Sequence, residues 1–437
     1  MVKLVLSKYL TIVPYRDYFL IVQGYSGAIV LIKKKIWNEV VANNYISDGR
    51  SGLDKIKITL LSKQILIPIG VNETSFIKKI FEKNLDRIEK DCYLGLYLTL
   101  RCNFACPYCY LDEQQTDITK EIAQKSLNDL FKRARRFKAE SVRIDFWGGE
   151  PLLCPDKLEY AVLEARKLSQ KFRIGLKFNL LSNGSIFNPR IARLFSRKKD
   201  LALVQIPLDG PQEIHDQRRF FKGGTGSYNR IINNLPSWMK IAQRVVIRVN
   251  IDGQNRKHIP RLLQELSRLN KNKLEVFLGN VAKRWGRGKE RKEVLEGCDY
   301  KPAENKFLLL AKKLGLKVVK GEFPTYRPIF CKASGAFPDW VGPDGKTYCC
   351  TKTVGNEYYR IGDIFKGCQD DKVKLWLGYN LIQNQNCLRC KHLFFCGGIC
   401  PADAMRGEKK KAFCGPGFKR YLRENLKEVK KKAEKIN

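Results

Sequence analysis

Six short apolar segments alternate with helical stretches across the middle of the chain, and this alternation restricts the fold more than any other feature. The helical stretches include KLEYAVLEARKLSQKF and IPRLLQELSRLN. Strands that alternate with helices of this length are typical of βα units in a parallel sheet. The sequence therefore predicts an α/β fold with six parallel strands, which begin near YLGLYLTL, VRIDFW, GLKFNLL, LALVQIPL, VVIRVNID and KLEVFLGN.

Three cysteines follow the first of these segments, in the run CNFACPYCY. Cys102, Cys106 and Cys109 have C-x3-C-x2-C spacing, with no fourth cysteine beside them. Closed iron–sulfur clusters and structural zinc sites take four ligands, whereas a catalytic metal keeps one coordination position for substrate. The triad indicates a metal centre with an open position. Alternatively, the three cysteines belong to a zinc ribbon or form a buried group of thiols.

The run C-x3-C-x-aromatic-C resembles the cluster loop of the radical S-adenosylmethionine (SAM) superfamily. In that family SAM chelates the open iron of a [4Fe-4S] cluster, and one electron cleaves its sulfonium to give a 5′-deoxyadenosyl radical. The resemblance implies that Cys102, Cys106 and Cys109 hold the catalytic cluster and that Tyr108 lies near the adenine. The six βα units would then form the family's partial (β/α)6 barrel, which is open on one side.

A second motif follows the second apolar segment, where VRIDFWGGEPLL contains Gly148, Gly149 and Glu150. This run resembles the GGEP loop of the same family. Glycines let the backbone approach a ligand closely, and the resemblance implies that Glu150 accepts a hydrogen bond from the amino group of SAM. Gly-Gly before a helix is ordinary turn chemistry when it stands alone. Because this Gly-Gly follows the cysteine triad, the resemblance to the family is more specific than the pair alone would be.

Polar residues also stand at the ends of later strands, where ligands bind in parallel α/β sheets. The resemblance implies contacts to the SAM carboxylate and ribose from Ser182, Asn183, Arg248 and Asn250. Pro207 stands where many relatives have serine, so that position offers no hydroxyl. Asp209, in the run PLDGPQEIHDQRR, either belongs to the site or caps a turn.

The C-terminal region carries a second cysteine pattern, formed by Cys331, Cys350, Cys387, Cys390, Cys396, Cys400 and Cys414. This spacing resembles the SPASM domain, which carries two auxiliary [4Fe-4S] clusters. The resemblance implies three [4Fe-4S] clusters in all. A zinc ribbon would explain the spacing of Cys387, Cys390 and Cys396, but not the whole pattern.

The resemblance also implies a ligand set for each auxiliary cluster. One cluster would be closed by Cys387, Cys390, Cys396 and Cys414. The other would use Cys331, Cys350 and Cys400, with its fourth position taken either by Cys349 or by a substrate group. The remaining cysteines without a pattern are predicted to be small buried hydrophobic side chains: Cys92, Cys154, Cys298 and Cys368.

About ninety residues precede the cluster loop. DYFLIVQG and GAIVLIKK predict paired strands, followed by helical IWNEVVANN, a strand at ILIPIG and a helix at SFIKKIFEKNLDRIEKD. This order resembles the winged-helix peptide-recognition element of maturases of ribosomally made peptides. The resemblance implies that an extended leader peptide adds a strand to the hairpin edge. The alternative is a cap that only packs on the barrel.

The expected domains are a winged-helix-like recognition element over 1–90, the barrel over 91–295, a bridging region over 296–325 and a cysteine-rich SPASM domain over 326–437. The last includes LRENLKEVKKKAEKIN, which is predicted to be a solvated basic helix. Fifteen cysteines, with no signal peptide and no apolar run of membrane-spanning length, predict a reducing cytoplasmic setting.

The chain is strongly basic, with 82 Lys and Arg against 44 Asp and Glu and a formal net charge of +38. Such a charge attracts nucleic acid, anionic membranes or acidic peptides. It reflects either a compositional bias of the source genome or an acidic leader peptide as partner. Neither a membrane nor nucleic acid is the expected partner.

The resemblances together predict a radical SAM enzyme that abstracts hydrogen from a ribosomally made precursor peptide and leads to a cross-link, an excision or an epimerisation. An electron donor such as flavodoxin or ferredoxin is an implied partner. Two alternatives remain. One is an anaerobic sulfatase-type maturase that forms formylglycine, and the other is a non-catalytic iron–sulfur or zinc protein that binds nucleic acid.

Overall fold

The structure is a computed structural model, and its chain forms two compact units that are described separately. It describes residues 2–47, 49–196, 198–269, 273–281, 295, 297–319, 326–329, 331–396, 400–405, 422–423 and 426–436. Unit 1 comprises Met1–Arg87, Phe323–Gly335 and Trp376–Asn437, and unit 2 comprises Ile88–Glu322 and Ala336–Leu375. The bounds of the four domains expected from the sequence stay predictions.

Unit 2 is built on a sheet whose six central strands are those expected from the sequence. They are β7 (Tyr93–Tyr97), β8 (Ser141–Trp147), β9 (Gly175–Leu181), β10 (Leu201–Pro207), β11 (Arg244–Ile251) and β12 (Leu274–Asn280). Each pairs in parallel with the next. The predicted α/β fold with six parallel strands is therefore confirmed.

The row of strands does not close on itself within the described part of the chain. At one end β7 pairs with β14 (Trp340–Val341), and at the other β12 pairs with β13 (Lys317–Val318). Beyond β14, antiparallel pairing continues the sheet through β15 (Lys346–Tyr348), β16 (Gly362–Asp363) and β17 (Gly367–Cys368).

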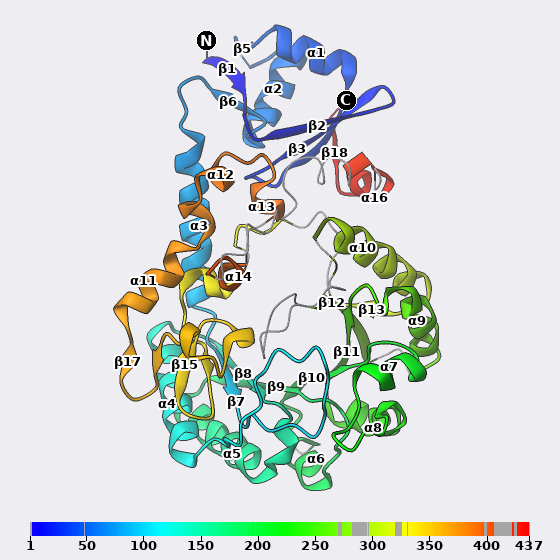
Figure 1. The fold of residues 1–437 in the computed structure, drawn as a ribbon. Coiled ribbons are helices and arrows are strands. Elements are labelled where there is room, and N and C mark those ends of the chain that lie inside the picture. Colours follow the sequence, from blue (N-terminus) through cyan, green and yellow to red (C-terminus); the bar gives the residue numbers. More distant parts are fainter. Residues whose placement is uncertain are drawn as a thin grey trace. The chain divides into compact units, whose positions relative to one another are not determined.

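Helices line the outer side of this curved row of strands (Figure 1). They are α4 (Lys120–Arg136), α5 (Pro155–Phe172), α6 (Pro189–Ser196), α7 (Gln212–Arg218), α8 (Tyr228–Ile241), α9 (Ile259–Ser267) and α10 (Gly297–Lys313). Short 3-10 turns lie at Pro151–Leu153, Arg256–His258, Thr351–Thr353 and Glu357–Tyr359.

The core of unit 2 lies between the sheet and the helices. Helix α5 buries Leu158, Ala161, Val162, Ala165 and Leu168, which form one face at helical spacing. Strand β8 alternates, with Val142, Ile144 and Phe146 buried in the same core and the residues between them less buried. One face of the sheet therefore carries the core. On the other face, β8 carries Arg143, Asp145 and Trp147, which are partly buried.

Unit 1 contains two small sheets. Strands β18 (Glu434–Ile436), β4 (Ile29–Lys33), β3 (Tyr18–Gln23) and β2 (Leu10–Tyr15) form one in that order, and β5 (Tyr45–Ile46), β1 (Val2–Leu6) and β6 (Leu66–Pro68) form the other. The predicted pairing of the two strands over residues 17–34 is confirmed, because β3 and β4 are antiparallel. The winged-helix assignment stays a prediction.

The helices of the N-terminal residues are α1 (Lys34–Ala42), α2 (Gly52–Ser62) and α3 (Glu73–Glu89). Later parts of the chain add α11 (Asp370–Gly378), α12 (Gln385–Leu388), α13 (Leu393–Cys396), α14 (Pro401–Met405) and α16 (Leu426–Lys431), with 3-10 turns at Lys332–Gly335 and Leu381–Gln383. None of the helices in the described ranges is long and apolar enough to span a membrane.

The prediction of one solvated helix for residues 422–437 is wrong in part. Helix α16 ends at Lys431, and β18 follows and joins the sheet of unit 1. The cause is the apolar Ile436, which is 7% exposed in the core of that unit. A lysine-rich segment can still place one aliphatic side chain in a core.

Candidate active site

The GGEP loop and the cysteine loop of unit 2 are joined by hydrogen bonds between their backbones. The amide of Gly149 donates to the carbonyl of Thr99 at 3.0 Å, and the amide of Glu150 donates to that of Arg101 at 2.8 Å. A Cβ on Gly149 would lie 2.2 Å from the carbonyl oxygen of Arg101. Only glycine permits this approach, so the GGEP loop fixes the start of the cysteine loop.

The cysteine loop is held from its other side by residues 220–222. The amide of Ala105 donates to the carbonyl of Phe220, and the amide of Lys222 donates to that of Asn103, each at 3.0 Å. The rings of Phe104 and Phe221 meet edge to face, with centroids 4.9 Å apart. The loop that carries the three thiols is therefore braced on two sides.

Cys102 and Cys106 are partly buried, and Cys109 is exposed. Burial raises the pKa of Cys102 to about 12, and it also raises the pKa of Cys106, against which the nearby Arg219 acts. The negative charges of the neighbouring thiolates add to both shifts. A positively charged iron cluster would supply the compensation that three thiolates on one loop need.

These three residues fit the protein ligands of a [4Fe-4S] cluster with one open iron, since they share a braced loop and include an accessible thiol. Within the described ranges, no three His, Cys, Asp or Glu side chains are arranged to hold one metal ion. The cysteines of a cluster need not converge on a single ion.

Glu150 is fully buried and contacts two of the expected site residues, Ser182 and Asn183. Its carboxylate accepts hydrogen bonds from the hydroxyl of Ser182 at 2.9 Å and from the amides of Asn183 at 2.7 Å and Leu152 at 3.0 Å. Burial raises the pKa of Glu150 to about 7, although these donors oppose the shift. A carboxylate has about four acceptor sites, so the group keeps capacity for one more donor.

Asn183 connects this carboxylate to the cysteine loop. Its side-chain amide donates to Oδ1 of Asn103 at 2.7 Å and lies 4.0 Å from Sγ of Cys102. Its own Oδ1 accepts from the amide and hydroxyl of Ser185. The structure therefore brings Glu150, Ser182 and Asn183 together beside Cys102, as the motifs suggested.

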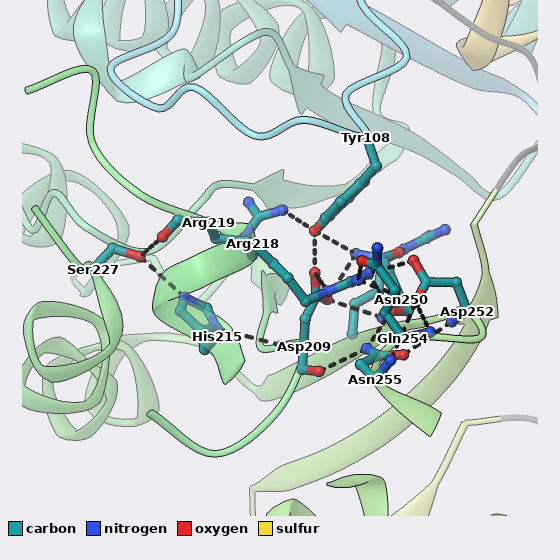
Figure 2. A network of polar contacts seen from close by, with 11 residues as sticks. Tyr108, Asp209, His215, Arg218, Arg219, Ser227, Asn250, Asp252, Gln254 and Asn255 are labelled. Carbon is teal, nitrogen blue, oxygen red and sulfur yellow. Dashed lines mark hydrogen bonds and ion pairs between the residues drawn. The ribbon is translucent and has the colours of Figure 1, made fainter. Parts of the chain in front are cut away.

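A second polar group surrounds Asp209, which is fully buried (Figure 2). Its carboxylate accepts hydrogen bonds from the hydroxyl of Tyr108 and, at 3.0 Å, from the amide of Asn250. Arg218 lies 3.6 Å from the same carboxylate and pairs with Asp252 at 2.9 Å. Asp209 thus bonds residues from distant elements rather than capping its own turn.

Tyr108 is fixed by two arginines as well as by Asp209. Its hydroxyl accepts from Arg219 at 2.7 Å, and the guanidinium of Arg218 lies 5.0 Å from the centre of its ring. Arg218 and Arg219 were not predicted to belong to the site. The sequence signal was the pair of arginines in HDQRR, at the end of the helix that follows the LDG turn.

His215 supports this group from behind. Its Nδ1 accepts from the amide of Asp209 at 3.3 Å, and its Nε2 lies 3.0 Å from the hydroxyl of Ser227, which itself donates to the carbonyl of Arg219. The ring is therefore neutral with its proton on Nε2. Burial, with the two neighbouring arginines, lowers the pKa of His215 well below its usual value. His215 therefore positions the turn at Asp209 directly and the backbone of Arg219 through Ser227.

Arg248 and Asn250 come from β11 and bond to each other, with Nε of Arg248 donating to Oδ1 of Asn250 at 2.8 Å. The guanidinium of Arg248 lies 5.2 Å from the centre of the Phe277 ring. Asn250 also lies 3.5 Å from the hydroxyl of Tyr108. The four residues expected near the SAM carboxylate and ribose therefore form two groups, one around Glu150 and one around Asp209.

Cys350 of unit 2 lies next to a chain of hydroxyl groups that leads toward the cysteine loop. The hydroxyl of Tyr97 is 2.8 Å from the carbonyl and 2.7 Å from the hydroxyl of Thr351, and it is 3.2 Å from the hydroxyl of Tyr110, the residue after Cys109. Cys349 is buried and Cys350 is partly buried.

The other cysteines of the C-terminal pattern are placed in unit 1: Cys331, Cys387, Cys390, Cys396 and Cys400. Cys414 lies outside the described residues, so its assignment as a ligand stays a prediction.

Among the cysteines without a pattern, the prediction of burial is confirmed for Cys92 and Cys154 and is wrong for Cys368. Cys368 is exposed because β17 is the last strand at its end of the sheet. The side chain of Cys298 lies outside the described residues.

Comparison with known proteins identifies the kind of domain that this site belongs to. The model of the radical SAM superfamily matches residues 96–266, which include both the cysteine loop and the GGEP loop. The chain carries a radical SAM domain. Radical SAM proteins bind a [4Fe-4S] cluster and SAM. The match ends at α9, before the C-terminal cysteine pattern.

The chain is also similar to an anaerobic sulfatase maturase. It is 29% identical over 181 residues to a cysteine-type anaerobic sulfatase-maturating enzyme of Clostridium novyi. The alignment covers 40% of this chain and 47% of that enzyme. The aligned region thus spans about half of that relative.

Two solved structures share the fold. The structure of anSMEcpe with bound AdoMet and the Kp18Cys peptide has a TM-score of 0.61 at 17% identity and covers 78% of this chain and 98% of that one. The structure of Streptococcus suis SuiB bound to its precursor peptide SuiA has a TM-score of 0.53 at 13% identity, and the match covers 95% of this chain and 99% of SuiB.

Proposed function

We propose that this chain is a radical SAM maturase that abstracts a hydrogen atom from a ribosomally made precursor peptide and so starts a post-translational modification. The observation that carries the proposal is the convergence of the cysteine loop, the Glu150 group and the Asp209 group at one end of a parallel sheet. A bound cluster and SAM would supply a 5′-deoxyadenosyl radical there.

The residues of the chain have binding and positioning roles in this proposal. Cys102, Cys106 and Cys109 hold the cluster. Glu150 has one remaining acceptor site, which suits the amino group of SAM, and Ser182 and Asn183 fix the direction of its carboxylate. The Glu150 group lies beside Cys102 and the Asp209 group holds Tyr108 of the same loop, so each group is available to a different end of a cofactor that has an amino acid part and a nucleoside part.

The Asp209 group would hold the nucleoside end. Asp209, Arg218 and Arg219 fix the ring of Tyr108, which offers a flat surface to an adenine, while Asn250 and Arg248 offer polar atoms beside it. Pro207 supplies no hydroxyl, so a ribose contact falls to these neighbours. Gly148 and Gly149 allow the GGEP loop to pack against the backbone of Thr99 and Arg101, which places Glu150 beside the cysteine loop.

A peptide substrate is supported by three observations. The chain has a net charge of +38, which suits an acidic peptide. Its fold is shared by a protein whose structure holds a precursor peptide. Unit 1 adds strands and helices in the order expected of a leader-binding element. Two auxiliary clusters and a flavodoxin or ferredoxin donor belong to the same proposal.

A sulfatase-type maturase is the second candidate, favoured by the sequence similarity to the Clostridium novyi enzyme. Both candidates need the same radical and differ in the molecule modified. A precursor peptide would lose two hydrogens in a cross-link, or a larger mass in an excision. A sulfatase would instead gain formylglycine at one cysteine or serine.

The first experiment measures 5′-deoxyadenosine released from SAM by the anaerobically reconstituted protein. Cys102→Ala should abolish release, whereas Cys368→Ala, at an exposed thiol far from both motifs in the sequence, should leave it unchanged. Co-expression with a short peptide encoded beside the gene then tests for a mass change. Release at the wild-type rate from Cys102→Ala would contradict the assignment of the cluster loop.

A further inference from the structure

Arg219 is a buried cation that bridges the residues on either side of Cys106. Its Nη1 donates a hydrogen bond to the hydroxyl of Tyr108 at 2.7 Å (Figure 2), and its Cζ lies 5.7 Å from the centre of the Phe104 ring. Phe104 and Tyr108 stand two residues before and two residues after Cys106 in the cysteine loop. The guanidinium therefore spans the part of the loop that carries the middle thiol.

The backbone around Arg219 fixes the side chain at this position. Its amide donates to the carbonyl of His215 at 2.7 Å, and its carbonyl accepts from the hydroxyl of Ser227 at 2.5 Å. Arg219 as a whole is 8% exposed. Since the backbone is bonded on both sides and the side chain is buried, the positive charge is held beside the loop rather than in solvent.

The preceding residue, Arg218, is paired with a carboxylate, whereas Arg219 is not. The guanidinium of Arg218 donates to Asp252 at 2.9 and 3.1 Å. In the described ranges no ion pair includes Arg219, and its Nε is buried without a hydrogen-bond partner. Burial would lower the pKa of Arg219, but interactions with neighbouring negative groups, the largest with Cys106, raise it well above its usual value. The charge that compensates Arg219 most is therefore the thiolate of Cys106.

A positive charge at this position favours the more negative state of the group that the thiolates hold. An iron–sulfur cluster becomes more negative by one unit of charge when it accepts an electron, and its reduction potential depends on the charge around it. Coulomb attraction grows with the product of the charges, so Arg219 stabilises the reduced state more than the oxidised state. Because Arg219 is buried, solvent and salt weaken this attraction less than they weaken that of an exposed lysine.

We propose that Arg219 raises the reduction potential of the cluster held by Cys102, Cys106 and Cys109, and so makes its reduction by a low-potential flavin or iron–sulfur protein more favourable. The donor loses one electron and the cluster gains it, while Arg219 keeps its proton throughout. Arg219 is a positioning residue here, because it acts through the thiolate of Cys106. The identification of the cluster rests on the proposed function, whereas the burial of Arg219 and its place beside Cys106 do not.

The test is a redox titration of the anaerobically reconstituted full-length protein with dithionite, followed by electron paramagnetic resonance of the reduced clusters. The signal that is absent from Cys102→Ala belongs to the catalytic cluster, which separates it from any auxiliary cluster. Arg219→Gln removes the charge and keeps an amide that can donate a hydrogen bond. Its equilibrium constant for one-electron reduction should fall about tenfold, which is a shift of about 59 mV to lower potential.

Two control variants separate charge from packing. Arg219→Lys keeps the charge, and its equilibrium constant should stay within about threefold of the wild type. Lys222→Gln removes a cation from the same segment that is 50% exposed and paired with Glu113, and it should change the constant less than about twofold. Equal potentials for wild type and Arg219→Gln would overturn the inference, as would equal shifts in Arg219→Lys and Arg219→Gln.

A variant of opposite sign keeps the inference testable if Arg219→Gln binds no iron. Asp209 acts on Cys106 in the sense opposite to Arg219, because its negative charge raises the pKa of that thiol. Asp209→Asn should therefore increase the equilibrium constant for reduction about twofold or more. Distorted packing of the loop gives no reason for shifts of opposite sign in the two variants. A lower potential in Asp209→Asn would overturn the inference.

The same preparations separate this inference from the proposed function. Release of 5′-deoxyadenosine with potentials that ignore the charge at residue 219 would overturn the role of Arg219 alone. Charge-dependent potentials in a protein that cleaves no SAM would overturn the maturase proposal and leave the role of Arg219 supported.

Discussion

Replacement of Gly149 by alanine is the most direct test of how the two motifs are joined. The added Cβ would lie 2.2 Å from the carbonyl oxygen of Arg101, 2.6 Å from its carbonyl carbon and 3.0 Å from Cβ of Cys102. Ordinary van der Waals contact begins at 3.4 Å, so the two backbones must separate by 3.4 − 2.2 = 1.2 Å. The clash is with backbone, which cannot rotate away as a side chain does.

The separation acts on both stability and chemistry. It breaks or lengthens the hydrogen bonds from Gly149 to Thr99 and from Glu150 to Arg101, which hold the start of the cysteine loop. Overpacking of this kind costs about 1 to 3 kcal/mol of the free energy of unfolding. A displacement of about 1 Å at a reacting centre costs about 10²-fold in rate. Gly149→Ala should therefore show both losses.

The assay compares Gly149→Ala with Gly223→Ala. A Cβ at Gly223 meets nothing within 4 Å, so this variant controls for the general effect of replacing glycine in a loop. The rate of 5′-deoxyadenosine release, the iron content and the midpoint of anaerobic urea unfolding are measured for each. Wild-type values for Gly149→Ala in all three would refute the close approach on which the site is built.

Three further predictions concern the buried polar groups. Asp209→Asn should lower the free energy of unfolding by about 2 to 3 kcal/mol, since it leaves the buried charge of Arg218 less compensated. The control Glu159→Gln, in the more exposed ion pair with Arg190, should cost less than about 1 kcal/mol. Equal urea midpoints for the two variants would contradict this. The pKa of Glu150 is raised to about 7, so its acceptor charge is lost as pH falls, and calorimetry should show the Kd for SAM rising about tenfold per pH unit below that value, whereas a flat profile from pH 6 to 8 would contradict its role. The pKa of His215 is lowered in the folded state, so below pH 6.5 the unfolded state binds a proton at this residue and the folded state does not. The free energy of unfolding should therefore decrease as the pH is lowered below 6.5. His215→Gln should make this pH dependence less steep in urea titrations.

The sequence predicted the elements that depend on local pattern. Strand β9 covers Gly175–Leu181, the same seven residues as the apolar run GLKFNLL, because one buried face in a parallel sheet requires regular alternation. The position of Glu150 beside Ser182 followed from the rule that loops at the carboxyl ends of parallel strands meet. The strand could be predicted from seven consecutive residues, and the contact between Glu150 and Ser182, which are 32 residues apart, could be predicted from the order of the strands alone.

The features that were missed, or left open as Asp209 was, depend on contacts between distant segments. Asp209 has the local appearance of a turn residue, and its partners Tyr108 and Asn250 reach it only through the pairing of β10 with β11 and the course of the cysteine loop. Cys368 is exposed because its strand is the last in the sheet, which no cysteine spacing reveals. Strand β18 was hidden by the lysines around a single aliphatic side chain.

Unit 1 has a consequence for synthesis of the chain on the ribosome. Val30 pairs with Glu434, so 434 − 30 = 404 residues must be added after β4 emerges before its partner strand exists. At typical elongation rates of about 5 to 20 residues per second, this takes about 20 to 80 s. During that interval the edge of β4 is open to other strands, while the intervening radical SAM domain already has all of its six central strands. The nascent chain is therefore most exposed to wrong strand pairing at its first sheet, and expression at lower concentration or with a chaperone should improve the yield of that unit first.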